Sequence, residues 1–167
     1  LVSLRSTENS IKLFYDKGQV VFISSNQIIT TRTLEGSYPN YSQLIPDNFN
    51  KLFTFNTKKI IESLERIAVL ADQQSSVVKI KLEEKNLALV SADAQDIGNA
   101  SELVPVSFDF DQFDIAFNVR YLLEGLKVIS SENVIFKCNL PTTPAVLVPD
   151  DNINSFTYLV MPVQVRS

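Results

Sequence analysis

Three aspartates near the middle of the chain are the residues best suited to metal chemistry. Asp109, Asp111 and Asp114 fall in the stretch DFDQFD, and carboxylate oxygens are the ligands that hard cations prefer. The stretch lacks the glycine and the final glutamate of a calcium-binding loop. The pattern therefore favours a solvated turn, without metal or cofactor. An enzyme that uses this cluster stays open as a hypothesis, which metal-dependent turnover would support.

Nucleophilic chemistry has little support in the composition. The 167 residues include no histidine, which removes the usual general base and the usual zinc ligand. The single cysteine, Cys138, lies in the strand-like stretch VIFKCN, which favours inert packing over a reactive thiol. One cysteine excludes an internal disulfide and fits a reducing cytoplasm. Apolar runs stay well below the roughly 18 residues of a membrane-spanning helix, so we expect no membrane contact.

The charges are distributed unevenly. With 15 basic and 19 acidic residues the formal net charge is -4, which alone disfavours nucleic acid. Two segments that resemble helices, Asn56–Ala71 and Asn118–Ile129, nevertheless carry a small positive excess. Their basic residues are Lys58, Lys59, Arg66, Arg120 and Lys127. Two solvated helix faces would explain this pattern, and so would a weak surface for a polyanion.

The chain ends on the apolar stretch TYLVMPVQVRS, residues 157–167. Chain termini are usually polar and poorly ordered. An apolar terminus is therefore either a strand held in a sheet or a segment kept for a partner.

An internal repeat organises the elements that would position these residues. Aligning Phe55 and Asn56 with Phe117 and Asn118 matches apolar residues along both segments at the spacing of an amphipathic helix. Each asparagine stands where a helix N-cap is expected. Strand-like runs follow each helix: 77–82, 87–92 and 102–108 after the first, and 133–138, 145–148 and the final stretch after the second. The repeat predicts a strand–helix–strand–strand–strand unit used twice, an α+β fold with two helices on antiparallel sheet.

The first part of the chain follows another pattern. Residues 10–36 contain three strand-like runs, and residues 37–48 form a proline-punctuated connector. Three strands bury too little to form a core alone. We therefore predict that residues 1–46 are the tail of a preceding domain with its connector, and that residues 47–167 form the next domain.

Three stretches together resemble one family. LEGSYPNYSQLIP (34–46), FNVRYLLEGLKVI (117–129) and YLVMPVQV (158–165) are similar to the bacterial DNA polymerase III beta subunit, the sliding clamp. The resemblance implies the DNA-clamp fold, with the end of a second domain and a whole third domain. It also implies a non-catalytic processivity factor, whose protomers close head-to-tail into a homodimeric ring around double-stranded DNA.

The resemblance assigns three surfaces. The helix cations would face DNA phosphates, and Val69 and Leu70 would contact the other protomer. Partners would insert QLxLF-type motifs into an apolar pocket between domains two and three. These partners would be the DNA polymerase III alpha subunit, the clamp loader, other polymerases and repair proteins. The pocket residues would be Pro39, Gln43, Leu44, Asn118, Tyr121, Thr142, Pro144, Leu159, Val160, Met161, Pro162, Val163, Gln164 and Val165.

Ordinary roles explain each pocket residue separately. Asn118 is also a helix cap, Tyr121 could pack on its helix, and Leu159 could be strand core. The alternative to a clamp is therefore a β-rich assembly module with no role on DNA, which oligomerises through its strand edges.

Overall fold

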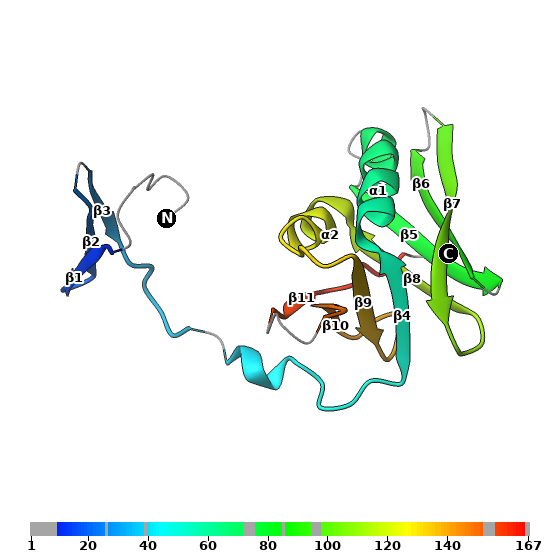
Figure 1. The fold of residues 1–167 in the computed structure, drawn as a ribbon. Coiled ribbons are helices and arrows are strands. Elements are labelled where there is room, and N and C mark those ends of the chain that lie inside the picture. The colour runs from blue at the N-terminus through cyan, green and yellow to red at the C-terminus, as the bar shows by residue number, and fades with distance from the viewer. Residues whose placement is uncertain are drawn as a thin grey trace. The chain divides into compact units, whose positions relative to one another are not determined.

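The computed structural model describes residues 10–165, apart from 26, 39, 72–75, 85, 95–97 and 152–155. The chain forms two compact units, residues 1–40 and residues 41–167 (Figure 1). Among the described residues, no helix is long and apolar enough to cross a membrane.

The smaller unit contains a three-stranded antiparallel sheet, β1 (Lys12–Asp16), β2 (Gln19–Ile23) and β3 (Ile28–Arg32). Lys17 and Gly18 join β1 to β2, with φ angles of 41° and 81°. A two-residue hairpin turn needs positive φ at these positions, which glycine adopts without strain. The three predicted strands are confirmed.

The larger unit follows the predicted repeat. Its elements, in chain order, are the short 3-10 helix η1 (Tyr41–Gln43), β4 (Lys51–Asn56), α1 (Thr57–Ala71), β5 (Val77–Glu84), β6 (Leu87–Ala94), β7 (Gly98–Phe108), β8 (Phe113–Asn118), α2 (Val119–Leu126), β9 (Asn133–Cys138), β10 (Ala145–Pro149) and β11 (Tyr158–Val160). The strands form one antiparallel sheet in the order β11-β10-β9-β4-β7-β6-β5-β8. The predicted α+β class is confirmed, and we call β4–β7 the first half and β8 to Val165 the second half.

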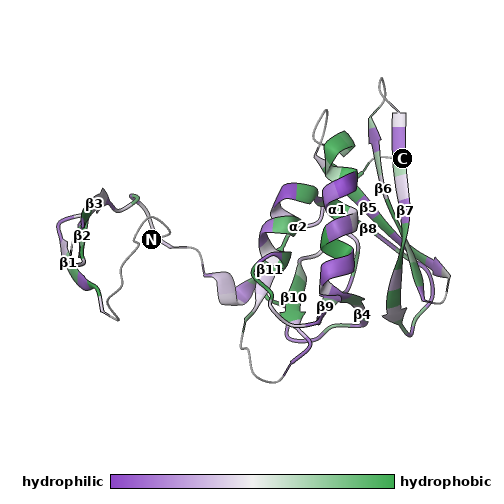
Figure 2. Cartoon of the chain, turned by 45° about the horizontal axis from the view of Figure 1, so that its top comes forward, coloured by the Kyte–Doolittle hydropathy of each residue, from purple (hydrophilic) through white to green (hydrophobic). Residues whose placement is uncertain are grey.

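Both helices pack side by side on the sheet (Figure 1). Polar and apolar residues alternate along them, and their apolar faces are buried (Figure 2). As predicted, an asparagine caps each start: Asn56 Oδ1 accepts from the N–H of Lys59 at 3.2 Å, and Asn118 Oδ1 accepts from the N–H of Arg120 at 3.0 Å.

The prediction that the second helix continues to Ile129 was wrong. α2 ends at Leu126, and the Ile129 N–H donates to the Leu126 carbonyl at 3.1 Å. This three-residue spacing tightens the last turn and ends the α-helix. Val128 and Ile129 are β-branched, which makes them poorer helix formers than the leucines before them.

The two halves exchange strands. β4 of the first half pairs with β9 of the second, while β8 of the second half pairs with β5 of the first. Phe53 and Phe136 face each other across β4 and β9, with stacked rings whose centroids are 5.0 Å apart. Each half thus completes the core of the other, so the halves form one domain.

The predicted final strand was wrong in extent. β11 ends at Val160, after which Pro162 forms a bridge to Phe117, and the Val163 N–H donates to the Ala116 carbonyl at 2.8 Å. The residue equivalent to Pro162 in the first half is Val106, whose N–H donates to the Asn86 carbonyl at 3.0 Å. Proline has no N–H, so this pairing is lost. We call residues 161–165 the C-terminal tail.

Candidate functional site

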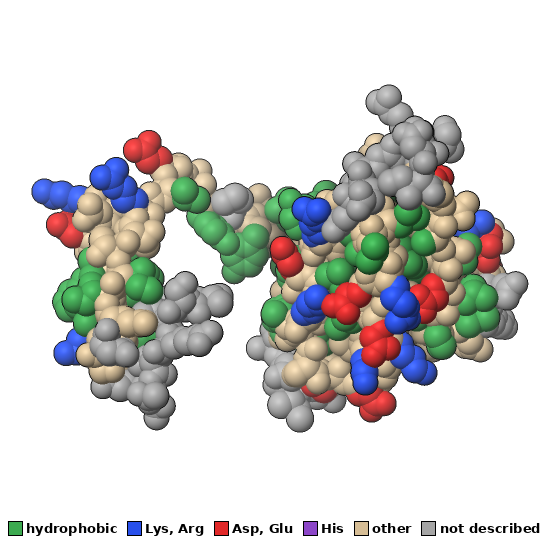
Figure 3. Space-filling model, turned by 90° about the horizontal axis from the view of Figure 1, so that it is seen from above, with side chains coloured by type: hydrophobic (Ala, Val, Ile, Leu, Met, Phe, Trp, Pro, Cys, Tyr) green, Lys and Arg blue, Asp and Glu red, His purple; other side chains and the backbone are tan. Residues whose placement is uncertain are grey.

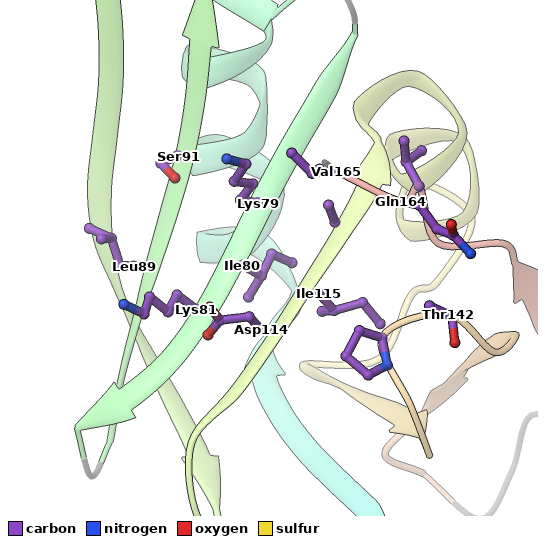
Figure 4. A pocket seen from close by; sticks show the side chains of 13 residues that line it. Lys79, Ile80, Lys81, Leu89, Ser91, Asp114, Ile115, Thr142, Gln164 and Val165 are labelled. Atoms are coloured by element: carbon purple, nitrogen blue, oxygen red, sulfur yellow. The ribbon is translucent and has the colours of Figure 1, made fainter. Parts of the chain in front are cut away.

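A groove of about 490 Å³ lies beside the C-terminal tail (Figure 4). Its lining comes from β5, β6, β8, the β9–β10 turn and the tail. The residues are Lys79, Ile80, Lys81, Leu89, Ser91, Asp114, Ile115, Ala116, Pro141, Thr142, Val163, Gln164 and Val165. The structure therefore brings together four of the predicted partner-binding residues: Thr142, Val163, Gln164 and Val165.

The groove exists because a small residue lies between larger ones. Ser91, Lys79 and Ala116 are aligned across β6, β5 and β8 on the face that points away from the helices, and Val163 is hydrogen-bonded to Ala116 on the other side. Adjacent strands are about 4.8 Å apart. The Ala116 methyl group therefore leaves a depression between the Lys79 stem and Val163.

Charged side chains border this depression. Lys81 forms an ion pair with Glu83. Hydrogen bonding to Glu83, and to a smaller extent the charge of Asp114, raises the pKa of Lys81. Lys79 is exposed, and the ion pairs found among the described residues do not include it. The groove thus has an apolar floor and a border of mixed charge, on which Lys79 is the cation that the described ion pairs do not include.

A second group of predicted residues lies where α2 meets β11. The Tyr158 hydroxyl donates to the Tyr121 carbonyl at 3.0 Å, and the Tyr158 ring lies against Gly125 so closely that a Cβ there would overlap it. Tyr121 and Met161 remain 59% and 54% exposed. Leu159 is half-buried, so this α2–β11 group offers an aromatic and two aliphatic side chains.

The remaining predicted partner residues are divided among other places. Val160 is buried in the core, Asn118 caps α2, and Pro144 and Pro162 are half-buried. Gln43 ends η1, and Leu44 follows it on the connector with half its surface exposed. Pro39 lies outside the described residues.

Most of the predicted DNA-facing cations lie next to carboxylates. Arg66 donates from Nε and Nη2 to the Glu102 carboxylate at 3.1 and 2.5 Å, and this pairing is the main reason that the pKa of Glu102 is lowered. Two further pairs are Lys127 with Glu65 at 2.7 Å and Lys58 with Glu62 at 3.9 Å. Lys59 and Arg120 are exposed. Figure 3 shows basic and acidic side chains intermingled on one face of this unit.

The end of α1 and part of β7 carry further exposed apolar residues. Val69 is 72% exposed and Leu70 is half-buried. On β7, Leu103 is 60% exposed, and residues 98–105 have no described strand partner on the β4 side. The sequence analysis missed this open edge, because strand register cannot be assigned from a single strand.

The chemistry suggested by the aspartates has no structural support. Asp109, Asp111 and Asp114 are exposed around the β7–β8 turn. Among the residues that the structure describes, no group of three possible ligands could hold a metal ion. Cys138 is a buried free thiol whose pKa burial raises to about 12, which agrees with inert packing.

Comparisons with known proteins first define the class of fold. The DNA polymerase III beta chain of Streptococcus pneumoniae matches with a TM-score of 0.81 and 30% identity, over 93% of this chain and 41% of that chain. The predicted DNA-clamp fold is therefore confirmed.

The family then follows from sequence similarity. A family model described as the DNA polymerase III beta subunit, C-terminal domain, matches residues 42–164. The beta sliding clamps of Synechococcus elongatus and Synechocystis sp. are 44% and 36% identical over 100% and 98% of this chain. The chain belongs to the DNA polymerase III beta subunit family, and it spans 44% and 42% of the lengths of these two relatives.

Proposed function

We propose that this chain is the C-terminal part of a DNA sliding clamp, a non-catalytic ring that tethers the replicative polymerase to duplex DNA. The observation that carries the proposal is 44% identity with a beta sliding clamp across the whole chain. Residues 1–46 would then be the end of a second domain with its connector, and residues 47–167 a third domain. The buried thiol of Cys138 fits a cytoplasmic location.

In this proposal, α1 and α2 face the DNA. Lys58, Lys59, Arg66, Arg120 and Lys127 would contact phosphates without reading sequence. Carboxylates pair with three of these cations, which keeps the helix surface weakly basic. Weak and exchangeable phosphate contacts suit a ring that must slide, and their affinity falls as salt rises.

The partner site would use the α2–β11 group and the tail. Tyr121, Leu159 and Met161 supply apolar surface for the Leu and Phe side chains of a QLxLF-type motif, and the thioether of Met161 adapts to different partners. Burying each anchor would contribute about 1.5–3 kcal/mol, which supports micromolar affinity. The polymerase III alpha subunit, the clamp loader and repair proteins would then exchange on one surface.

Ring closure would use the end of α1 and the edge of β7. Val69, Leu70 and Leu103, which are exposed or half-buried, would be its apolar contacts, and residues 98–105 of β7 have no described partner on the β4 side. A strand from the other protomer could pair with this edge. The resulting head-to-tail homodimer needs residues that this chain does not contain.

A chimera tests the clamp function. We would replace the matching C-terminal segment of the Synechococcus elongatus clamp with this chain and load the protein onto nicked circular DNA. The chimera should stay on circular DNA and leave after linearisation, because a ring is retained by topology. A matched chimera that carries Val69→Glu and Leu103→Glu should dissociate from circular and from linear DNA alike. Equal release of the chimera from circular and linear DNA would refute the proposal.

An NMR titration tests the partner site. The labelled chain would be titrated with a QLxLF-type peptide and with a scrambled control. Shifts should gather around Tyr121, Thr142 and residues 158–165.

The second candidate is the assembly module, which the exposed Leu13, Phe14 and Ile28 on the smaller sheet favour. Oligomers that grow with concentration, without any response to the peptide, would support it and contradict the clamp.

A further inference from the structure

We propose that the groove beside β8 binds an extended peptide segment of a partner protein as an added strand, and that this segment carries an aliphatic residue next to a carboxylate. The inference rests on the proposed clamp function, because the segment would belong to a protein that also uses the α2–β11 group. It extends that function to a contact on another part of the sheet.

The first half of the larger unit shows that a strand can pair along the edge that β8 leaves open in the second half. Thr54 and Phe53 of β4 are the equivalents of Ala116 and Ile115 of β8. In the first half, β7 continues along β4, with Ser107 opposite Thr54 and Phe108 opposite Phe53. In the second half, pairing along β8 stops after Pro162 and Val163. Opposite Ala116 the tail supplies Val163, as β7 supplies Ser107 opposite Thr54. Opposite Ile115 and Asp114 the described residues show no strand pairing on this side, so the position that Phe108 fills in the first half is open among them.

Backbone groups of β8 face this open position. The Ala116 carbonyl accepts from Val163 on the tail side, and residues two apart along a strand direct their backbone groups to the same side. The N–H and carbonyl of Asp114 therefore also point toward the tail, where the described residues provide no strand partner beyond the bridge at Phe117. An added peptide strand would supply hydrogen bonds for both groups.

The side chains around the position define the chemistry of the segment. Ala116 forms a small apolar floor between Val163 and the aliphatic stem of Lys79, which suits a Leu, Ile or Val side chain. Lys79 is exposed beside this floor and forms none of the ion pairs found among the described residues. Asp114 also lines the groove, so the side of the floor near Lys79 is where a carboxylate next to the aliphatic residue would be paired and a lysine repelled.

The groove is continuous with the proposed partner site. The tail begins at Met161, a member of the α2–β11 group, and continues to Val163 and Val165, which line the groove. One partner chain could therefore occupy both surfaces by following the tail. Linking two weak contacts in this way raises affinity through effective concentration.

Fluorescence anisotropy with the full 167-residue chain tests the groove. The probes are a QLALF peptide and two extended versions, which carry Glu-Leu-Glu on a Gly-Ser linker at the N-terminal or the C-terminal end. At least one extension should tighten binding about fivefold. The same extension with lysine in place of glutamate should give no gain.

Variants of the chain test whether the added affinity of the extended peptide comes from the groove. Lys79→Glu should abolish it by reversing the charge, and Ala116→Leu should abolish it by filling the floor, while the affinity for QLALF stays unchanged. Lys137→Glu is the matched control, because it makes the same charge change on β9, the equivalent of β5 in the other half. A gain that survives Lys79→Glu and Ala116→Leu, or no gain from either extension, would overturn the proposal.

A direct titration separates failure of the groove from failure of the clamp function. The labelled chain would be titrated with a Glu-Leu-Glu-Leu-Glu peptide that lacks the QLALF motif. Shifts at the amides of Asp114 and Ala116 would support the groove even if QLALF does not bind, and their absence would overturn it. Concentration-dependent dimers that disappear in Ala116→Leu would assign the position to a second copy of this chain, and would also overturn it.

Discussion

The two halves of the larger unit place different chemistry at equivalent positions. In the first half, Glu102 on β7 accepts two hydrogen bonds from Arg66 on α1. The equivalent of Glu102 in the second half is Tyr158 on β11, whose ring lies against Gly125 and whose hydroxyl donates to the Tyr121 carbonyl. An ion pair thus joins helix to strand in one half, and an aromatic contact does so in the other.

This difference shows which parts of the repeat are free to change. The strand pairs that build the core are kept in both halves, since Phe53 faces Phe136 where Ile115 faces Ile80. The last strand is not kept: β7 has 11 residues and β11 has 3. The candidate partner surfaces lie where the second half departs from the first, at β11, the tail and the open position beside β8.

Truncating core side chains where the halves exchange strands, at the β4–β9 and β5–β8 pairs, should have the largest effect on stability. We expect Phe136→Ala to lower the free energy of unfolding by about 4 kcal/mol and Ile80→Ala by about 3 kcal/mol. Since the halves exchange strands, each variant should still unfold in a single transition. Urea denaturation followed by circular dichroism and by tyrosine fluorescence measures both properties. Two separate transitions would show that the halves are independent.

An exchange at the helix glycine should have an intermediate effect. Ser63 on α1 is the equivalent of Gly125 on α2. Gly125→Ser should cost about 2–3 kcal/mol, because the new side chain overlaps the Tyr158 ring. Ser63→Gly should cost about 1 kcal/mol, the usual penalty of glycine in a helix. Denaturant midpoints compare the two variants, and a smaller loss for Gly125→Ser would contradict the close packing.

The smallest expected effect is a difference between the halves in how stability depends on pH. Arg66 lowers the pKa of Glu102 from 4.5. The stabilisation of the folded state by the ionised Glu102 is therefore present above about pH 4.5 and is lost as pH falls through the folded pKa. Burial is the main reason that the pKa of Tyr158 is raised from 10.0, so its contribution is present below about pH 10 and is lost as pH rises through the folded pKa.

Melting temperatures across pH measure these two contributions. Glu102→Gln should flatten the acid side of the stability profile, and Tyr158→Phe should flatten the alkaline side. A variant that changes the opposite side of its profile would contradict the assignment.

The sequence predicted the repeat well because periodic burial dominates it. The match of Phe55 and Asn56 with Phe117 and Asn118 located both helices and both caps. The errors arose at the ends of helices and strands, where a single backbone N–H decides whether the element continues. Pro162 shortened the final strand, and a tightened turn shortened α2 at Leu126.

The candidate site was less accessible from sequence. Val163 belongs to a stretch that resembles the family, and the resemblance also assigned Thr142 to the partner pocket. The structure places both residues on the groove. Lys79, Leu89 and Ala116 carried no signal beyond the alternation of ordinary strands. Their juxtaposition depends on the register of three strands, which no local pattern determines.

The strand exchange also constrains how the protein can be made. A nascent chain that leaves the ribosome with β4, α1, β5, β6 and β7 complete still lacks β8 and β9, the partners of β5 and β4. The first half can reach its native pairing only after Cys138, the end of β9, has emerged. Until then its apolar strands have open edges, the exposure that chaperones protect during translation.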